Sequence, residues 1–273
     1  MKFSSVFLYL VLSAACAGGK EIKYTGSTPA DRLVRIFLEI SLSDSIDFIR
    51  WNLSLEENRY TLHCNYGIGK PNSNGFINGG KIIELSGELK MGKNIYQLQN
   101  GKLSLRLARL NDNLLHFMNK NNNLLAGNGG WSYTLNNLTP VLTDQVSITA
   151  KQSEMDDSLV FEGRTPCGIP GIIPRSSECY KLKWLIVLYA NEENKQGNYL
   201  MKGTPWREAG GRTGNWKIET GKDGRIIFRL DDENNTPLIR LLKLDEDVVI
   251  FTDEKGNLLV GDLDFSYTLN RRR

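Results

Sequence analysis

Histidine, cysteine and the common catalytic motifs are scarce in this chain of 273 residues. His63 and His116 are its only histidines, and neither Gly-x-Ser-x-Gly nor His-Glu-x-x-His occurs. No glycine loop of the phosphate-binding type lies between a strand and a helix pattern. Serine–histidine–acid catalysis and zinc-dependent hydrolysis therefore lack their usual residues. We expect a protein that is not an enzyme and that needs no cofactor.

A strong excess of one charge is also missing. The 34 basic and 31 acidic side chains leave a net charge of +3, and Lys and Arg are spread along the chain. Nucleic acid is therefore not an expected partner. No segment after the N-terminal region is apolar enough to cross a bilayer. With 40% apolar and 24% charged residues, the composition is that of an ordinary globular protein.

Residues 1–19 are typical of a secretory signal and its attachment region. Lys2 precedes an apolar run, residues 6–12, and then small residues that end at Cys16. The segment "LSAAC" resembles a bacterial lipobox, although its Leu12 lies one position further from the cysteine than usual. We expect acylation of Cys16, which would anchor an outer-membrane lipoprotein in the bacterial cell envelope. Cleavage at the small residues of "ACA" would instead release a periplasmic or secreted protein.

The chain repeats itself. Residues 119–136, "NKNNNLLAGNGGWSYTLN", align with residues 253–270, "DEKGNLLVGDLDFSYTLN". Three further pairs follow in the same order: "YTGSTP" with "FEGRTP", "RWNLSL" with "KWLIVL", and "LRLARLNDNLLHF" with "IRLLKLDEDVVIF". Four blocks in one order indicate two homologous units. We place them at residues 20–137 and 158–273, with a linker at residues 138–157.

Both units have the pattern of β-strands. Tyr60, Leu62 and Cys64 alternate with polar residues, as expected when successive side chains point to opposite faces of a sheet. Asn- and Gly-rich turns separate the strands closely, which indicates an all-β sandwich or barrel. The repeated ending predicts a closing hairpin in each unit, because a long unpaired edge invites aggregation. Residues 30–42 fit a helix or a strand.

The second unit resembles the N-terminal domain of the NlpE family. The similarity lies in "FEGRTPCGIPGI", "GNWKIETGKDGRIIFRL", "FTDEKGNLL" and the final "YTLN". The first unit shares "YTGSTPA" and the closing hairpin. NlpE proteins are bacterial envelope lipoproteins linked to copper resistance and to envelope-stress sensing. The resemblance implies an all-β fold of two tandem lipocalin-like antiparallel β-barrels.

The cysteines depart from the family pattern. Where the family has Cys-x-x-Cys, Cys167 is followed by "GIPG", and the first unit has neither cysteine. Cys167 and Cys179 remain as a candidate pair that would form a disulfide in an oxidising compartment or bind a soft metal ion. Cys64 is expected to be a buried thiol. His63 points to the opposite strand face from Cys64, so we predict no metal site there.

The tryptophans divide into two groups. Trp51, Trp131 and Trp184 fall on apolar faces, so we expect them in the cores. Trp206 lies in the Gly- and Pro-rich segment "GTPWREAGG", where an exposed ring would contact a partner.

Together these features predict a non-enzymatic envelope lipoprotein of NlpE-like type. It would display a rigid β scaffold at a membrane surface and bind or sense an envelope protein, in copper tolerance or envelope stress. The alternative is a lipocalin-like carrier of a small apolar ligand, which requires an empty lumen. An interior closed by the side chains of Trp51, Tyr60 and Tyr133 would leave no such cavity, whereas a dry pocket would favour the carrier. A copper-binding protein is a further alternative.

Overall fold

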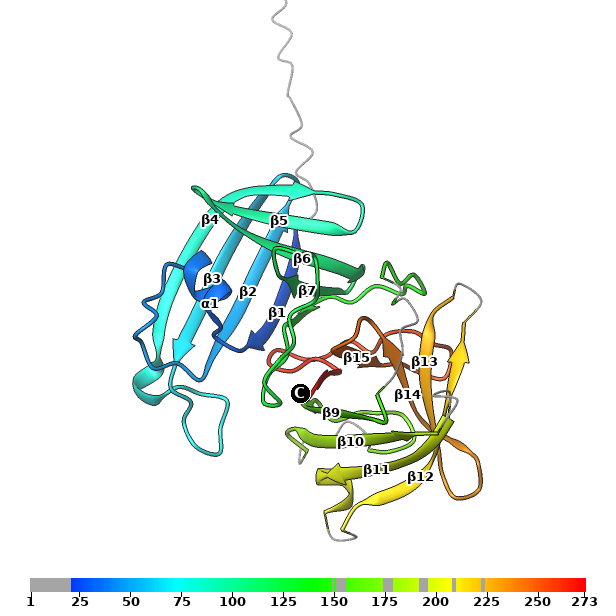
Figure 1. Cartoon of the computed structure of the whole chain (residues 1–273). Helices are drawn as coiled ribbons and strands as arrows, with labels where there is room; N and C mark the ends of the chain where they lie inside the picture. Colours follow the sequence, from blue (N-terminus) through cyan, green and yellow to red (C-terminus); the bar gives the residue numbers. More distant parts are fainter. Residues whose placement is uncertain are drawn as a thin grey trace, which may run out of the picture.

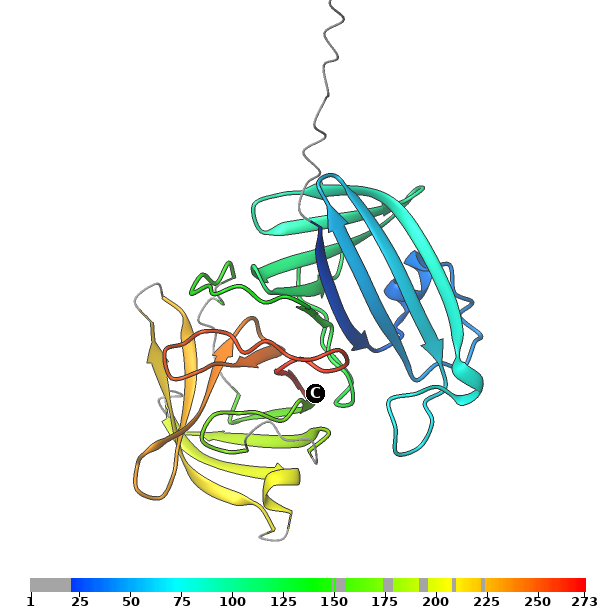
Figure 2. The same ribbon diagram turned by 180° about the vertical axis from the view of Figure 1, so that it is seen from behind.

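The structure, a computed structural model, describes residues 21–148, 150, 156–173, 179–191, 196–207, 210–221 and 224–273. These residues form two closed barrels of eight antiparallel strands, which lie side by side (Figure 1). Figure 2 shows the same pair from behind, with the C-terminus again where the barrels meet. The predicted all-β fold with two tandem barrels is confirmed. None of the described helices is long and apolar enough to span a bilayer.

In the first barrel each strand pairs with the next, and the last pairs with the first. Its strands are β1 (Ile22–Thr28), β2 (Phe48–Glu56), β3 (Arg59–Gly67), β4 (Lys81–Met91), β5 (Ile95–Asn100), β6 (Leu103–Asn111), β7 (Leu114–Met118) and β8 (Thr134–Asn137). The helix α1 (Arg32–Phe37) follows β1, and a 3-10 turn, η1 (Ile77–Gly79), precedes β4. Within residues 30–42 the helical alternative is therefore the correct one.

The second barrel has the same up-and-down order. Its strands are β9 (Ser158–Thr165), β10 (Leu182–Ala190), β11 (Gln196–Gly203), β12 (Arg212–Thr220), β13 (Ile226–Asp231), β14 (Pro237–Lys243), β15 (Val248–Phe251) and β16 (Thr268–Arg271). A 3-10 turn, η2 (Thr204–Trp206), follows β11. β16 closes the barrel against β9.

Aromatic side chains fill the first lumen. Trp51, Tyr60 and Tyr133 are at most 2% exposed. Phe117 lies edge-on to the Trp51 ring, with 4.8 Å between centroids. Each buried aromatic ring contributes about 1.5–3 kcal/mol by its removal from water. These rings occupy the space in which a carrier would hold its ligand.

The two units repeat one another in three dimensions. The Trp51 indole donates to the Thr28 hydroxyl at 2.8 Å, and Trp184 donates to Thr165 at the same distance. Each threonine hydroxyl in turn donates to the carbonyl of the following proline at 3.0 Å. The repeated "TP" and the repeated tryptophan therefore form the same clamp in each barrel.

A glycine precedes each clamp for a steric reason. A Cβ atom on Gly26 would lie 2.9 Å from the Thr134 carbonyl oxygen, and one on Gly163 would lie 2.8 Å from the Leu269 side chain. At these glycines β1 lies very close to β8, and β9 lies very close to β16. A side chain would not fit between the strands at either position.

The linker packs against the first barrel. Residues 138–148 contain no regular strand. The Ser147 amide donates to the Leu110 carbonyl at 2.7 Å, and the Asn94 side chain donates to the Ser147 carbonyl at 3.0 Å. Val146 and Ile148 pack against an apolar cluster that includes Leu110 of the first barrel and most of the buried apolar side chains of the second. The linker is therefore held to the first barrel by hydrogen bonds.

Candidate functional site

The two barrels contact one another through their repeated closing hairpins. The Ser132 and Ser266 hydroxyls lie 2.7 Å apart, and the Thr134 and Thr268 hydroxyls lie 2.9 Å apart. Both contacts join a residue to its own equivalent, 134 positions later. Contacts between equivalent residues define a local two-fold axis, as in an isologous dimer. The repeated "SYTLN" therefore serves the interface as well as each barrel.

Amide side chains repeat this symmetry away from the axis. Asn136 accepts a hydrogen bond from the Gly261 amide at 2.9 Å, and Asn270 accepts one from the Gly127 amide at 2.7 Å. Asn136 and Asn270 are equivalent, as are Gly127 and Gly261. These hydrogen bonds of the interface thus occur in two equivalent copies.

A stack of four aromatic rings runs across the interface. Trp131 of the first unit stacks on Phe265 of the second, with 4.9 Å between centroids and 3° between ring planes. Phe48 stacks on Trp131, and Phe76 stacks on Phe48, both at 4.3 Å. Trp131 is buried in an apolar cluster, as predicted, but this cluster lies at the interface between the barrels and not inside a barrel. Strand β8 begins only at Thr134, so Trp131 precedes the strand and contacts the other barrel instead.

One half of this interface carries its own counter-charge. Asp264 accepts hydrogen bonds from the Arg50 guanidinium at 2.9 Å, from the Asn74 amide at 2.8 Å and from the Ser27 hydroxyl at 3.3 Å. Arg50 also lies over the Phe76 ring, 5.7 Å from its centroid. A cation of the first barrel is thus neutralised by an acid of the second.

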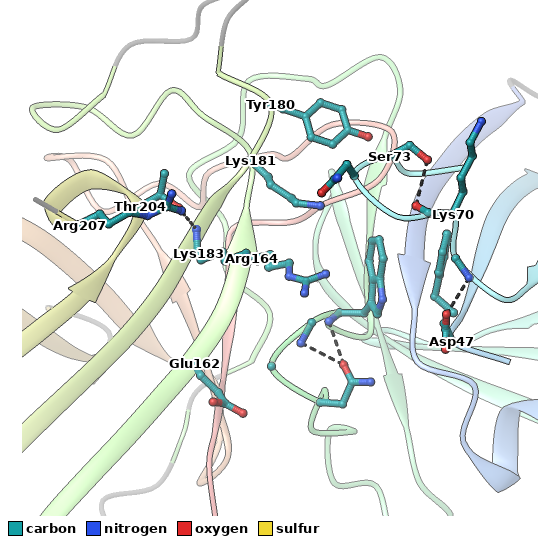
Figure 3. A pocket seen from close by; sticks show the side chains of 17 residues that line it. Asp47, Lys70, Ser73, Glu162, Arg164, Tyr180, Lys181, Lys183, Thr204 and Arg207 are labelled. Atoms are coloured by element: carbon teal, nitrogen blue, oxygen red, sulfur yellow. Dashed lines mark hydrogen bonds between the residues drawn. The ribbon is translucent and has the colours of Figure 1, made fainter. Parts of the chain in front are cut away.

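The other half lacks that acid. Gly129 and Gly130 stand where the second unit has Leu263 and Asp264. A cleft of about 910 Å³ opens there between the barrels (Figure 3). Five basic and two acidic side chains line it, namely Lys70, Arg164, Lys181, Lys183, Arg207, Asp47 and Glu162.

Three of the cations form a cluster, two of them on adjacent strands and the third just before β10. Arg164 of β9 and Lys183 of β10 are direct register partners, and Lys181 precedes Lys183 by two positions. Like charges directly opposite one another destabilise a strand pair. None of the three forms an ion pair with another described residue. Burial, followed by the charges of Arg164 and Lys183, lowers the pKa of Lys181, while Asp264 opposes that shift.

Two of the cations lie against rings of the aromatic stack. The Arg164 guanidinium lies 5.8 Å from the Trp131 centroid, and the Lys181 ammonium lies 5.6 Å from the Phe265 centroid. Such cation–π contacts hold the side chains in place without neutralising their charge. In Figure 3, Arg164 and Lys181 extend from the strands of the second barrel toward the first. The arrangement is suited to binding an anion.

The residues singled out from the sequence lie as follows. Cys16 falls outside the described residues. Cys167 and Cys179 form a disulfide with a Cα–Cα distance of 6.0 Å. Tyr180 and Lys181 come directly after this bond, which therefore ties the rim of the cleft to the end of β9. Trp206 is half-buried and lies edge-on to Trp184 at 5.7 Å, so its ring packs on the second core rather than standing free.

Soft metal ligands are not gathered at one point. Among the described residues no group of three or more His, Cys, Asp or Glu side chains is placed to hold a metal ion. The bond between Cys167 and Cys179 leaves neither sulfur as a thiolate. Cys64 is fully buried, and burial raises the pKa of its thiol. His63 lies on the outer face beside Glu84, at 3.2 Å.

His116 is buried next to the two-fold axis. Its Nε2 lies 2.9 Å from the Leu125 carbonyl, so this nitrogen must donate. Its Nδ1, 2.7 Å from the Thr134 hydroxyl, therefore accepts, and Thr134 in turn accepts from Thr268. Burial lowers the pKa of His116 to about 4, against the opposing effect of the Leu125 carbonyl. With this pKa the imidazole is neutral at pH 7, which is the state in which Nδ1 accepts from the Thr134 hydroxyl.

Comparison of the chain with protein-family models, with curated proteins and with solved structures found no match. The cleft must therefore be judged on its own geometry. Sequence reasoning did not select Arg164, Lys181 or Lys183. A signal was present in the aligned repeats, where Ser27 aligns with Arg164 and Asp264 with Gly130. Its meaning depends on knowing that these positions face one another across the interface.

Proposed function

We propose that this protein is a non-enzymatic bacterial envelope lipoprotein of NlpE-like type that binds an envelope protein through the cleft between its barrels. Cys16 would carry the acyl anchor, and the paired barrels would hold the cleft open at the membrane surface. The role in copper tolerance or envelope-stress sensing is proposed from the sequence resemblance.

One observation carries the proposal. The cleft presents an unneutralised cluster of Arg164, Lys181 and Lys183 against an aromatic wall, on a scaffold whose barrels are packed with side chains. A site that is charged, partly apolar and concave suits a protein segment. The filled first lumen argues against an apolar-ligand carrier. The bond between Cys167 and Cys179 argues against copper binding by that pair.

A site-specific cross-link tests the proposal. The exposed side chain of Tyr180, at the rim of the cleft, is replaced by p-benzoylphenylalanine in the full chain, expressed in the source cells. Tyr189 on β10 is the matched control, because it is 47% exposed against 53% for Tyr180 and does not line the cleft. On irradiation we expect one discrete adduct from position 180 and none from position 189.

Two results would count against this function. Equal labelling from both positions would show nonspecific contact. A complete lack of adducts at position 180, in cells where the protein is folded and exported, would remove the cleft as a protein-binding site. An adduct that is also lost in the Arg164→Gln variant would tie the contact to the cationic cluster.

A further inference from the structure

We infer that the cleft binds a carboxylate from an acidic segment of the partner, in the position equivalent to that of Asp264 in the other half of the interface. This inference rests on the proposed function and names the chemistry of its ligand. It follows from the way in which the two halves of a nearly symmetric interface differ.

In the half of the interface that contains Asp264, here called the closed half, the cation is paired with a carboxylate. Arg50 is the equivalent of Lys183, and it is matched by a carboxylate, Asp264, at 2.8–2.9 Å. The same carboxylate also accepts from Asn74 and Ser27. In this half the protein supplies the anion itself.

The open half keeps the cations and lacks the anion. Lys183 replaces Arg50, Arg164 replaces Ser27, and Gly130 replaces Asp264. A Cβ atom on Gly130 would lie 3.7 Å from the Arg164 guanidinium, with no described atom closer than the Asn128 side chain at 3.3 Å. Space for a carboxylate is therefore present beside Arg164.

The acids that line the cleft do not supply the missing charge. Asp47 accepts a hydrogen bond from the Gly69 amide at 2.7 Å. Glu162 lies beside Gly129, and its nearest cation is Arg272 at 4.0 Å. Five basic groups against two acidic ones leave an excess of positive charge in a site shielded by two barrels. An incoming carboxylate would form charge-assisted hydrogen bonds there.

The shape of the cleft favours a peptide segment over a membrane. Its cations lie between two convex barrels, and Phe48, Trp131 and Tyr180 contribute to its walls. A flat layer of lipid headgroups cannot reach the bottom of a concave site. An acidic side chain on an extended segment can, and its neighbours would meet the aromatic walls.

Binding of a defined probe tests the inference. The probe is a fluorescein-labelled hexaglutamate peptide, with hexaglutamine as the uncharged control, measured by fluorescence anisotropy at low salt against the full chain. We expect saturable binding of hexaglutamate alone. The substitution Gly130→Asp supplies the internal carboxylate that Asp264 provides in the other half. It should weaken binding by at least about tenfold, or about 1.4 kcal/mol.

Two further variants complete the experiment. The double variant Arg164→Gln, Lys181→Gln should also weaken binding by at least about tenfold. Lys217→Gln removes an exposed lysine of β12 that does not line the cleft, and it should change the affinity by less than about twofold. Unchanged melting temperatures would show that the variants remain folded.

Several results would overturn the inference. These are no saturable binding of hexaglutamate by the folded wild type, equal weakening in Lys217→Gln, or full affinity in Gly130→Asp. If phosphate displaces the peptide and binds with the same affinity as hexaglutamate, the site would be assigned to small anions. Tighter binding to vesicles that contain anionic lipid, lost in the same variants, would assign it to a membrane. If hexaglutamate fails while the Tyr180 cross-link persists, the ligand chemistry is wrong and the proposed function stands.

Discussion

Removing the charge of Asp264 should destabilise the interface between the barrels. The Asp264 side chain is only 18% exposed and that of Arg50 only 29%. In Asp264→Asn the shape is kept, but the Arg50 guanidinium loses its counter-ion in a site that water reaches poorly. The protein would keep a half-buried, unpaired charge, which is the costly outcome of breaking such a pair.

The size of the effect follows from the contacts. A hydrogen bond to a charged group contributes about 1.5–3 kcal/mol, and a neutral one about 0.5–1.5 kcal/mol. Asp264 makes a charged contact with Arg50 and neutral ones with Asn74 and Ser27. Allowing for the partial exposure of both partners, we expect the free energy of unfolding to fall by about 2 kcal/mol.

Urea unfolding at pH 7, followed by tryptophan fluorescence, measures this change. Asp144→Asn is the control, because Asp144 is exposed in the linker, and it should lie within about 0.5 kcal/mol of wild type. In the opposite direction, Gly130→Asp should raise the stability by about 0.5–1 kcal/mol, by offsetting the repulsion between Arg164 and Lys183. A loss below about 0.5 kcal/mol in Asp264→Asn would refute the assignment of Asp264 as the counter-ion of the interface.

Three further predictions concern the buried histidine, the repeated clamp and the anchor. His116 has a pKa near 6.5 in the unfolded chain and of about 4 in the folded one. Its contribution to the free energy of unfolding should therefore be fully present above pH 6.5, and up to about 3 kcal/mol of it should be lost as the pH falls to 4. Urea unfolding at pH 7.5 and 4.5 should show a smaller drop in His116→Asn; an equal drop would exclude His116 as the cause. Thr165→Val leaves the Trp184 indole without its acceptor and should cost about 1–3 kcal/mol, as should Thr28→Val in the first barrel; a cost in only one barrel would contradict their equivalence. Radiolabelled palmitate should enter the wild type but not Cys16→Ala, whereas equal labelling would remove the proposed anchor.

Local patterns in the sequence were sufficient for the all-β class and for the division into two similar units. Alternation in residues 60–66 places every second side chain on one face, because the pleat of a strand has a period of two. Tyr60, Leu62 and Cys64 are indeed buried. The repeated blocks also predicted two similar units, since the same residues in the same order make the same clamp and the same closing strand.

The position of Trp131 shows what local patterns leave open. Its alternation with Tyr133 predicts a core residue, but β8 starts only at Thr134. Trp131 lies three residues before the strand, and it stacks on Phe265 of the other unit. A sequence pattern records which side chains avoid water, and it does not record which surface covers them.

What the sequence by itself determined is therefore two similar all-β units with a repeated ending, because strand pleating and repeated blocks act over short stretches of chain. Only the tertiary structure decided that these endings face one another across a two-fold axis. The candidate site depends on that axis, since it brings Gly130 against Arg164 while placing Asp264 against Arg50. The missing carboxylate in the cleft is evident only when the two halves of the interface are compared in space.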